Sequence, residues 1–249
     1  MDDSEPFVSF AGVVAGYGGG DVLKGVEFDV PRGGVTCIVG PNGSGKSTLL
    51  KTVSGLLRPR LGEIKFKGQS LVGLTPRQIL KLGVVQVPQN HSLFREMSVQ
   101  LNVELGAFLV KDRKVINERM DHVRELFPIV AERAKDKAGS LSGGQQRLVE
   151  FARCLMLEPE LVVLDEPSMG LDPKTLRSMF NTIKMMTSAG RTVLLVEQNA
   201  RQALRMSSFA VVLENGQVRL SGTGHDVLNN PEIGALYLGG NIEESSNTP

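Results

Sequence analysis

The stretch VTCIVGPNGSGKST, residues 35–48, decides the fold of this chain. Its first six residues form a short apolar run that ends in glycine, which is typical of a strand buried in a parallel sheet. Residues 40–47 fit the pattern G-x-x-x-x-G-K-[ST], in which backbone N–H groups surround phosphate oxygens. Because we expect a strand before this loop and a helix after it, the stretch predicts a phosphate-binding loop rather than an ordinary glycine-rich turn.

Each residue type in this loop has a chemical reason. Glycines let backbone N–H groups turn inward, and the N-terminus of the following helix, expected from Lys46 to near Gly55, adds its positive dipole end. We expect Lys46 to reach the β- and γ-phosphates of a nucleotide and Ser47 to bind Mg²⁺. The predicted nucleotide-contacting residues of the loop are Gly40, Pro41, Asn42, Gly43, Ser44, Gly45, Lys46, Ser47 and Thr48.

The segment LVVLDE, residues 161–166, is predicted to be an apolar strand that ends in two carboxylates. We expect Asp165 to hold Mg²⁺ through water and to complete the ion's shell with Ser47. Glu166 is expected to polarise the attacking water. Two solvated acids at a strand end are the alternative, but a phosphate loop elsewhere in the chain requires such an acid. Together the two motifs predict a nucleotide hydrolase.

Short apolar strands alternate with helices through most of the chain. VVQVP (84–88), TVLLVE (192–197) and FAVVLENG (209–216) are strand-like, and Thr75 and Asp172 have the marks of helix caps. This alternation predicts a parallel α/β sheet with phosphate chemistry at the C-terminal ends of its strands.

The N-terminal strand pattern has one flaw. In VLKGVEFDV (22–30) a period of two predicts a strand with Val22, Val26, Phe28 and Val30 on one side, but it puts Lys24 on that apolar side as well.

A mostly helical block interrupts the alternation like an inserted subdomain, with one helix expected to open at Ser142. We therefore divide the chain into an N-terminal part of the core (1–89), a helical subdomain (90–157), a C-terminal part of the core (158–240) and a polar tail (241–249) that is expected to be flexible.

Composition excludes several classes of protein. The 249 residues carry 28 basic and 27 acidic side chains, a formal charge of +1, which gives no electrostatic footprint for nucleic acid. Cys37 and Cys154 are expected to be buried, reduced thiols. The start has no secretory signal, and no apolar run approaches the ~18–20 residues of a membrane span. A membrane role would therefore depend on a partner.

The motif LSGGQ (141–145) is not needed to bind the chain's own nucleotide. Together with the strand 161–166 and SMGLD (168–172), its position resembles the ATP-binding cassette ATPases of ABC transporters, over residues from about Phe7 to Gly240. The resemblance implies a phosphate-loop NTPase with a RecA-like parallel-sheet core, an N-terminal antiparallel β-subdomain and an inserted α-helical subdomain.

In that family two cassettes pair head to tail, and each ATP lies between one chain's phosphate loop and the other chain's signature. The resemblance therefore implies that Ser142, Gly143, Gly144 and Gln145 face the partner's ATP, where N–H groups at a helix start would form a second anion site. Asp172 matches the position that couples the two sites across the dimer. One chain alone should bind ATP but hydrolyse it poorly.

Two further positions carry over from the family. Tyr17, in AGYGGG, matches the aromatic residue that stacks on adenine, a core tyrosine being the alternative. Gln89, in VVQVPQN, matches the glutamine that meets Mg²⁺ or water and senses the membrane partner, with the neighbouring Gln86 as the alternative. The helical segment after Gln89 is where this family docks its membrane subunits.

One position departs from the family pattern. The histidine that usually contacts the γ-phosphate is replaced by Gln198 in VEQN, and none of the three histidines of the chain is positioned to substitute for it. Glutamine can donate a hydrogen bond but cannot carry charge or shuttle a proton. We therefore expect slower hydrolysis at this chain's site, which a paired subunit that retains the histidine could offset.

Several segments resemble one subfamily, the cassettes of branched-chain amino acid importers: LLVEQNA (194–200), SGLLRP (54–59), SGTGHDVL (221–228) and ALYLGG (235–240). Urea and short-amide importers look very similar, and LFREMSV (93–99) resembles the second cassette of the same systems. The leading hypothesis is thus an energy-coupling ATPase of an amino acid importer.

This hypothesis implies ATP and Mg²⁺ as cofactors and a peripheral place on the cytoplasmic face of the membrane. It implies integral membrane permeases and a second cassette, identical or different, as direct partners, an extracytoplasmic solute-binding protein as an indirect one, and no nucleic acid. The alternatives are an exporter cassette of the lipopolysaccharide-extracting type, a DNA-repair or translation ATPase, and a nucleotide-binding module without turnover.

Overall fold

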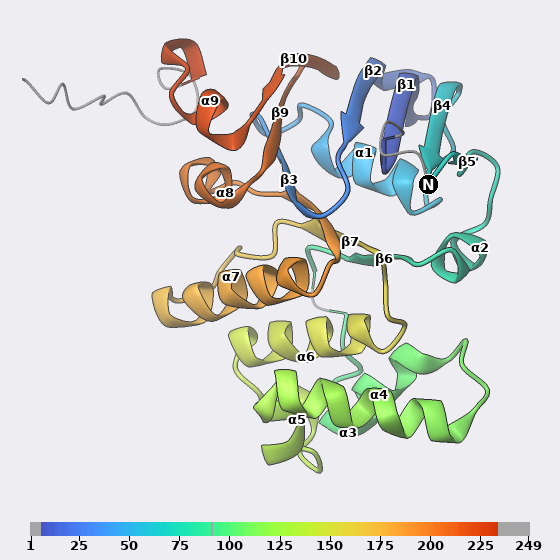
Figure 1. Ribbon diagram of the computed structural model, residues 1–249, viewed down its shortest axis with the longest axis vertical. Coiled ribbons are helices and arrows are strands. Elements are labelled where there is room, and N and C mark those ends of the chain that lie inside the picture. Colours follow the sequence, from blue (N-terminus) through green and yellow to red (C-terminus); the bar gives the residue numbers. More distant parts are fainter. Residues whose placement is uncertain (1–5, 91, 234–249) are drawn as a thin grey trace, which may run out of the picture.

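The computed structural model describes residues 6–90 and 92–233 of the chain, which form two sheets and a set of helices (Figure 1). The larger sheet has six strands, in the spatial order β10 (Gln217–Gly222), β9 (Phe209–Glu214), β3 (Gly34–Val39), β8 (Thr192–Val196), β7 (Leu161–Asp165) and β6 (Val84–Val87). All neighbours pair in parallel except β10, which is antiparallel to β9. The predicted α/β fold with a parallel core sheet is confirmed.

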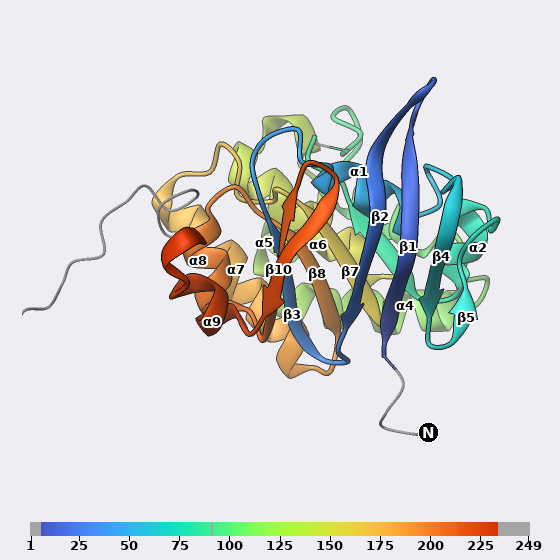
Figure 2. The same cartoon turned by 90° about the horizontal axis from the view of Figure 1, so that it is seen from above.

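The smaller sheet is antiparallel. Its strands follow the order β2 (Gly20–Val30), β1 (Val8–Tyr17), β4 (Leu61–Phe66) and β5 (Gln69–Ser70), and Figure 2 shows them beside the core sheet. The two sheets are joined at one edge, where the N–H of Lys24 donates to the carbonyl of Gly216 over 2.8 Å.

The expected inward position of Lys24 is wrong. The pairing of β2 with β1 skips Gly25, whose φ is +83°, so a bulge shifts the side-chain alternation by one residue. Leu23 is buried in place of Val22 and Lys24, and the buried side continues through Val26, Phe28 and Val30. A sequence period cannot reveal this change because the bulge itself resets the period.

The core sheet is buried on both faces, which explains why its strands are continuously apolar. In β7, Val162 and Leu164 face the apolar core shared with the helices α6 and α7, whereas Leu161 and Val163 face the core shared with α1 and the antiparallel sheet. The two cysteines are buried as free thiols, as expected, and burial raises the pKa of Cys154 to about 12.

The helices of the described residues surround the two sheets: α1 (Lys46–Val53), α2 (Pro76–Lys81), α3 (Val99–Glu104), α4 (Arg113–Leu126), α5 (Pro128–Glu132), α6 (Gly143–Leu155), α7 (Pro173–Ser188), α8 (Ala200–Met206) and α9 (Gly224–Leu228). Helices α3, α4 and α5 lie at the end of the molecule opposite the antiparallel sheet, and α6 lies between them and α7 (Figure 1). No helix in the described part of the chain is long and apolar enough to cross a membrane. The predicted tail, 241–249, lies outside the described residues.

Candidate ATP site

The phosphate loop connects β3 to α1, as the sequence predicts. Gly40 and Gly45 have φ angles of +153° and +107°, which side chains other than hydrogen rarely allow. A Cβ on Gly40 would lie 2.0 Å from the carbonyl oxygen of Leu213, and one on Gly45 would lie 2.8 Å from the Leu23 side chain. Both glycines are therefore required by packing as well as by backbone conformation.

Lys46 folds back over the loop. Its ammonium group donates to the carbonyl oxygens of Gly40 (2.9 Å) and Pro41 (3.0 Å). Burial lowers the pKa of Lys46, and the charges of Glu166 and Asp165 raise it. The cation thus lies between the loop backbone and two carboxylates, at the point where phosphate oxygens would meet it.

Two hard oxygen donors meet beside the loop. The hydroxyl of Ser47 donates to Oδ1 of Asp165 over 3.1 Å, across 118 residues of sequence. Burial raises the pKa of Asp165, and the hydrogen bond from Ser47 lowers it. A hydroxyl and a carboxylate at this distance fit a small hard cation such as Mg²⁺, which prefers oxygen ligands.

Glu166 lies at the end of β7 in a strained conformation, with φ at +44°. Its N–H donates to the carbonyl of Val196 over 2.9 Å. The side-chain amide of Gln89 donates to the Glu166 carboxylate (3.0 Å) and to the sulfur of Met169 (3.2 Å). Gln86, the alternative to Gln89, lies in β6 and has no such contact with Glu166.

Lys46, Ser47, Gln89 and Glu166 line one pocket of about 520 Å³. Asp165 is buried and is not among the lining residues, but it accepts the hydrogen bond from Ser47, which is one of them. The predicted residues that line the pocket are Asn42, Gly43, Gly45, Lys46, Ser47, Thr48, Gln89, Glu166 and Gln198, joined by Val22 and Met169. The pocket opens at the C-terminal ends of β3, β7 and β8, where a parallel sheet places its ligand. Ser44 is buried in the loop behind it.

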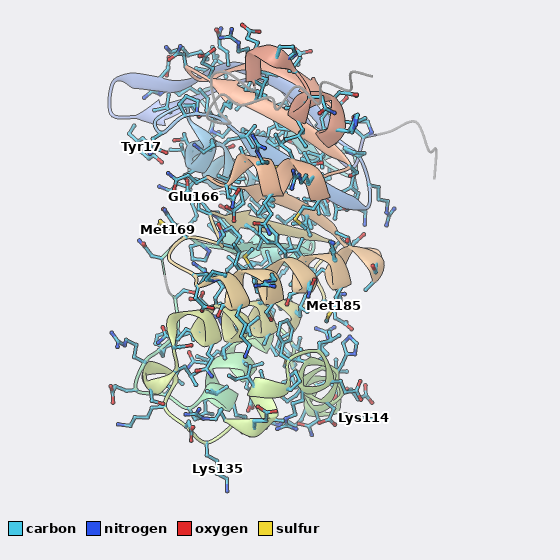
Figure 3. The ribbon with its side chains drawn as sticks, turned by 90° about the vertical axis from the view of Figure 1, so that its left-hand side faces the viewer. Tyr17, Lys114, Lys135, Glu166, Met169 and Met185 are labelled. Carbon is cyan, nitrogen blue, oxygen red and sulfur yellow. The ribbon has the colours of Figure 1, made fainter. Side chains whose placement is uncertain are left out.

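Tyr17 is not a core residue, because 51% of it is exposed. It ends β1 on the face of the molecule that also carries Glu166 and Met169 (Figure 3). Lys51 donates to its hydroxyl over 3.2 Å, with the ammonium 5.4 Å from the ring centroid. The open ring near the phosphate loop is available for stacking.

The signature residues do not join this pocket. Ser142 caps α6, where its hydroxyl accepts from the N–H of Gln145 (3.3 Å) while the Gln145 side chain accepts from the N–H of Ser142 (3.0 Å). A Cβ on Gly144 would lie 2.1 Å from the Thr175 methyl carbon, so Gly144 lets α6 approach α7. Ser142 and Gly143 are exposed.

Asp172 is the exposed cap of α7. It accepts from the N–H groups of Lys174 (3.0 Å) and Thr175 (3.1 Å) and from the Thr175 hydroxyl (2.5 Å). These hydrogen bonds, first among them that of the Thr175 side chain, lower the pKa of Asp172. Thr175 therefore touches both Gly144 and Asp172, which links the signature to the start of α7.

Sequence reasoning missed a buried ion pair in α6. Arg147 and Glu150 are 2% and 1% exposed and lie 2.9 Å apart. Arg147 also donates to the carbonyls of Pro88 (2.9 Å) and Gln89 (2.5 Å), and Glu150 accepts from Ser92. The pair fastens the Gln89 segment to the signature helix. Arg147 and Glu150 lie three residues apart on an otherwise apolar helix face, and this pattern could have predicted the buried ion pair.

A second missed residue, Glu197, directly follows β8 and precedes Gln198. It is 1% exposed and accepts two hydrogen bonds from Ser168, in the loop that follows Glu166. A lone acid after an apolar strand gave no signal of such a partner.

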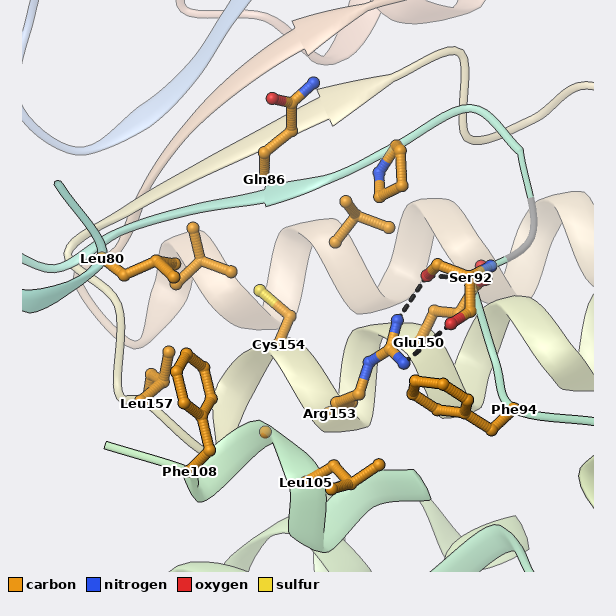
Figure 4. A pocket seen from close by; sticks show the side chains of 14 residues that line it. Leu80, Gln86, Ser92, Phe94, Leu105, Phe108, Glu150, Arg153, Cys154 and Leu157 are labelled. Atoms are coloured by element: carbon orange, nitrogen blue, oxygen red, sulfur yellow. Dashed lines mark hydrogen bonds between the residues drawn. The ribbon is translucent and has the colours of Figure 1, made fainter. Parts of the chain in front are cut away.

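An apolar groove of about 370 Å³ lies between β6 and the helical end of the molecule. Phe94, Phe108 and Leu105 line the groove, and the two phenylalanines are 57% and 59% exposed (Figure 4). Arg153 also lines it and donates to the carbonyl of Ser92 over 2.9 Å. Glu150 also lines the groove, so the network around Gln89 reaches this surface.

Comparison with known proteins identifies the family. The family profile described as ABC transporter matches residues 23–169. The chain belongs to the ABC transporter family. Members of this family are ATP-binding cassettes, as MJ1267 is, and this chain is an ATPase of that kind.

The cassette is similar to relatives over nearly its whole length. It is 40% identical over 233 residues to the high-affinity branched-chain amino acid transport ATP-binding protein BraG of Pseudomonas aeruginosa, covering 94% of this chain and 100% of BraG. It is 35% identical to the probable branched-chain amino acid transport ATP-binding protein LivF of Archaeoglobus fulgidus, covering 90% of this chain and 95% of LivF.

Solved structures agree with this placement. The ADP conformation of MJ1267, an ATP-binding cassette of an ABC transporter, superposes with a TM-score of 0.85 at 29% identity, covering 95% of this cassette and 100% of MJ1267. A dimeric post-hydrolysis state of the cassette MJ0796 with ADP and Pi has a TM-score of 0.77 at 26% identity, covering 90% and 99%.

Proposed function

We propose that the cassette is the energy-coupling ATPase subunit of an importer for branched-chain amino acids. The observation that carries the amino acid assignment is the 40% identity to BraG over the full length of that protein. The chain's own geometry bears on the ATPase chemistry, because substrate-contacting residues of an importer lie in other chains.

In the proposed reaction the phosphate loop and Lys46 bind the β- and γ-phosphates of ATP. Bound Mg²⁺, with Ser47, Asp165 and Gln89 as its ligand set, would supply charge neutralisation for the phosphate oxygens. Glu166 orients and polarises the attacking water. Gln89 donates to the Glu166 carboxylate in this structure, and this hydrogen bond breaks when ATP enters the pocket. Gln198 donates a hydrogen bond toward the γ-phosphate.

Half of the proposed catalytic site comes from a second cassette. Ser142 and Gly143 are exposed at the start of α6 and do not line their own chain's pocket. The dimeric MJ0796 structure, with ADP and Pi, supports pairing of this kind. Asp172, exposed at the start of α7, would then lie at the seam between the two chains.

The apolar groove is the proposed docking site for a cytoplasmic segment of a permease. Its open side carries exposed aromatic rings, which a soluble chain rarely leaves uncovered unless they meet a partner. Glu150 and Ser92 line the same groove and hold the Gln89 segment through Arg147. Binding of a permease segment there would therefore change the position of the Gln89 segment at the ATP site, as an energy-coupling subunit requires.

The test begins with tagged cassette purified from gently solubilised native membranes, with all accompanying chains identified by mass. Two multi-span proteins and a second cassette are expected. ATP hydrolysis by that complex in liposomes should rise with leucine, isoleucine or valine when the system's solute-binding protein is added, but not with urea. A Glu166→Gln complex is the matched control, because it should assemble normally without turnover.

Stimulation by urea or a short amide would replace the amino acid assignment with that of an amide importer. A single permease type without a second cassette would point to an exporter. Only ribosomes or nucleic acid in the purified material would contradict a role in transport.

A further inference from the structure

The buried carboxylate of Glu197 joins the two loops that carry the proposed catalytic side chains. Its Oε1 accepts from the N–H of Ser168 over 3.0 Å, and its Oε2 accepts from the Ser168 hydroxyl over 2.5 Å. Glu197 directly follows β8, whereas Ser168 lies in the loop after β7, 29 residues earlier. The carboxylate does not line the ATP pocket.

The first loop needs such an anchor. Glu166 adopts φ of +44°, a left-handed conformation that is strained for a non-glycine residue and persists only when its surroundings hold it. Its N–H is held by the carbonyl of Val196, and its carbonyl accepts from Met169 over 3.2 Å in a tight turn. Ser168, inside that turn, is the residue that Glu197 binds.

The second loop begins at the same carboxylate. Gln198 follows Glu197 directly, and its carbonyl accepts from the N–H of Ala200 at the start of α8 (2.8 Å). Burial raises the pKa of Glu197, while hydrogen bonds from Ser168 and from the backbone of Asn199 and Gln198 lower it. The carboxylate therefore faces backbone groups of both loops.

Either protonation state can keep this contact. A charged carboxylate accepts both hydrogen bonds from Ser168, and a protonated one accepts from the N–H and donates to the hydroxyl. An amide of the same shape can do the same, since its oxygen accepts and its NH₂ group donates. An apolar side chain can do neither and would leave a buried N–H unpaired.

We propose that Glu197 is a positioning residue that fixes Glu166 and Gln198 relative to each other for ATP hydrolysis, without touching the nucleotide itself. This inference rests on the catalytic roles proposed above for Glu166 and Gln198. Its consequence is that loss of the Glu197–Ser168 contact lowers kcat and leaves ATP affinity largely unchanged, because the phosphate loop lies between β3 and α1 and Lys46 begins α1, outside the two anchored loops.

The experiment compares Glu197→Gln, Glu197→Leu and Ser168→Ala in the complex isolated through the tagged full-length chain. Three quantities are measured: kcat at saturating MgATP, the Kd of a fluorescent ATP analogue, and the thermal midpoint of unfolding. Hydrogen exchange of the peptide that spans residues 166–171 reports directly on the anchored loop. Glu166→Gln serves as the benchmark for complete loss of catalysis.

We expect Glu197→Leu to lower kcat by about 10²-fold, the size of effect caused by misplacement of a catalytic group by about 1 Å, with faster exchange of the loop and an unchanged Kd. Ser168→Ala, which loses only one of the two hydrogen bonds, should lower kcat by roughly 2–10-fold. Glu197→Gln should keep kcat within about twofold of the native value, because its amide can make both contacts.

Normal kcat in a folded Glu197→Leu complex would overturn the inference, as would equal damage from Glu197→Gln and Glu197→Leu. Should Glu197→Leu fail to fold, Ser168→Ala decides: native kcat in that variant contradicts the role of Glu197, and a selective loss of kcat supports it. If Glu166→Gln itself hydrolysed ATP normally, the proposed catalytic assignment would fail first. If Glu166→Gln were inactive while Ser168→Ala and Glu197→Leu kept native kcat, only the present inference would fail.

Discussion

The phosphate loop and the signature are both glycine-rich starts of helices, but the chain completes only one of them as a ligand site. At the phosphate loop, Lys46, Ser47 and Glu166 line one pocket, and Ser47 donates to the buried Asp165. At the signature, Gly144 packs on a neighbouring helix, and exposed Ser142 and Gly143 do not line that pocket. In the proposed function, this exposed helix start is the half of a site that a second chain would complete.

The largest expected effects come from substituting one residue in the phosphate loop and one in the signature, each in a separate variant. Lys46→Ala should weaken ATP binding by about 10–100-fold, since a charge-assisted hydrogen bond contributes about 1.5–3 kcal/mol. Gly143→Arg, a bulky change at an exposed position, should leave ATP affinity intact and abolish measurable hydrolysis. Fluorescent ATP titration and phosphate release would measure the two effects, and weakened ATP binding in Gly143→Arg would place the signature in its own chain's site.

The buried ion pair of α6 connects the two regions, because Arg147 links the signature helix to the Gln89 segment. Arg147→Met should lower the free energy of unfolding by about 3–5 kcal/mol, the usual effect of removing one partner of a buried ion pair. The double variant Arg147→Met, Glu150→Leu should recover part of that loss. Denaturant unfolding of the native chain, Arg147→Met, Glu150→Leu and the double variant completes a double-mutant cycle, and strict additivity would mean that the two charges do not interact.

The close approach at Gly144 can be tested by adding one methyl group. Gly144→Ala should destabilise the cassette by about 1–3 kcal/mol, since the new Cβ would overlap Thr175 and α6 must shift. Combining it with Thr175→Ser removes the methyl carbon, which is the nearest atom, but keeps the hydroxyl that donates to Asp172, so the double variant should recover part of the lost stability. Urea unfolding measures this, and a single variant as stable as the native chain would contradict the packing role of Gly144.

The glutamine in place of the usual histidine predicts a smaller effect within the pocket itself. Gln198→His should raise turnover by up to about tenfold, because a charged donor strengthens the hydrogen bond to the γ-phosphate by about 1 kcal/mol. Steady-state phosphate release by the assembled complex measures this, with Asn199→His as a matched control one position away. Unchanged turnover in Gln198→His would mean that this chain's site does not limit the rate.

The smallest expected effect concerns the cap of α7. The pKa of Asp172 is lowered in the folded chain, so its charge stabilises the fold at pH values above 3.8, the ordinary pKa, and this contribution is lost as pH falls through the lowered folded value. Asp172→Asn keeps a capping oxygen without the charge. Its thermal midpoint should lie slightly below that of the native chain near neutral pH, and the difference should vanish in strong acid.

The features that the sequence predicts best are those formed by consecutive residues. The phosphate loop, the strand before Asp165 and the caps at Thr75, Ser142 and Asp172 are local patterns, and the structure forms each helix and strand where expected. The motifs also predicted that Ser47 and Asp165 come together across 118 residues. Contacts between distant residues outside the motifs were not predictable. The position of Lys24 changed because of a bulge set by pairing with another strand.

The same limit explains the missed residues of the site. Arg147 reaches a carbonyl 58 residues away, and Glu197 binds a serine 29 residues away. Charge in an apolar segment signals that a buried polar partner exists, but a single sequence does not say which residue it is. The fold was therefore predictable from motifs, whereas the contacts that hold the catalytic loops required coordinates.

The burial of both cysteines has a practical consequence for studying this cassette. Cys37 and Cys154 are the only cysteines of the chain, and burial raises both thiol pKa values, so little reactive thiolate forms near neutral pH. The native chain should therefore react slowly with maleimides. A cysteine introduced at Ser142 would be labelled selectively without removal of either native residue, and its protection by ATP would report the arrival of the opposing chain in real time.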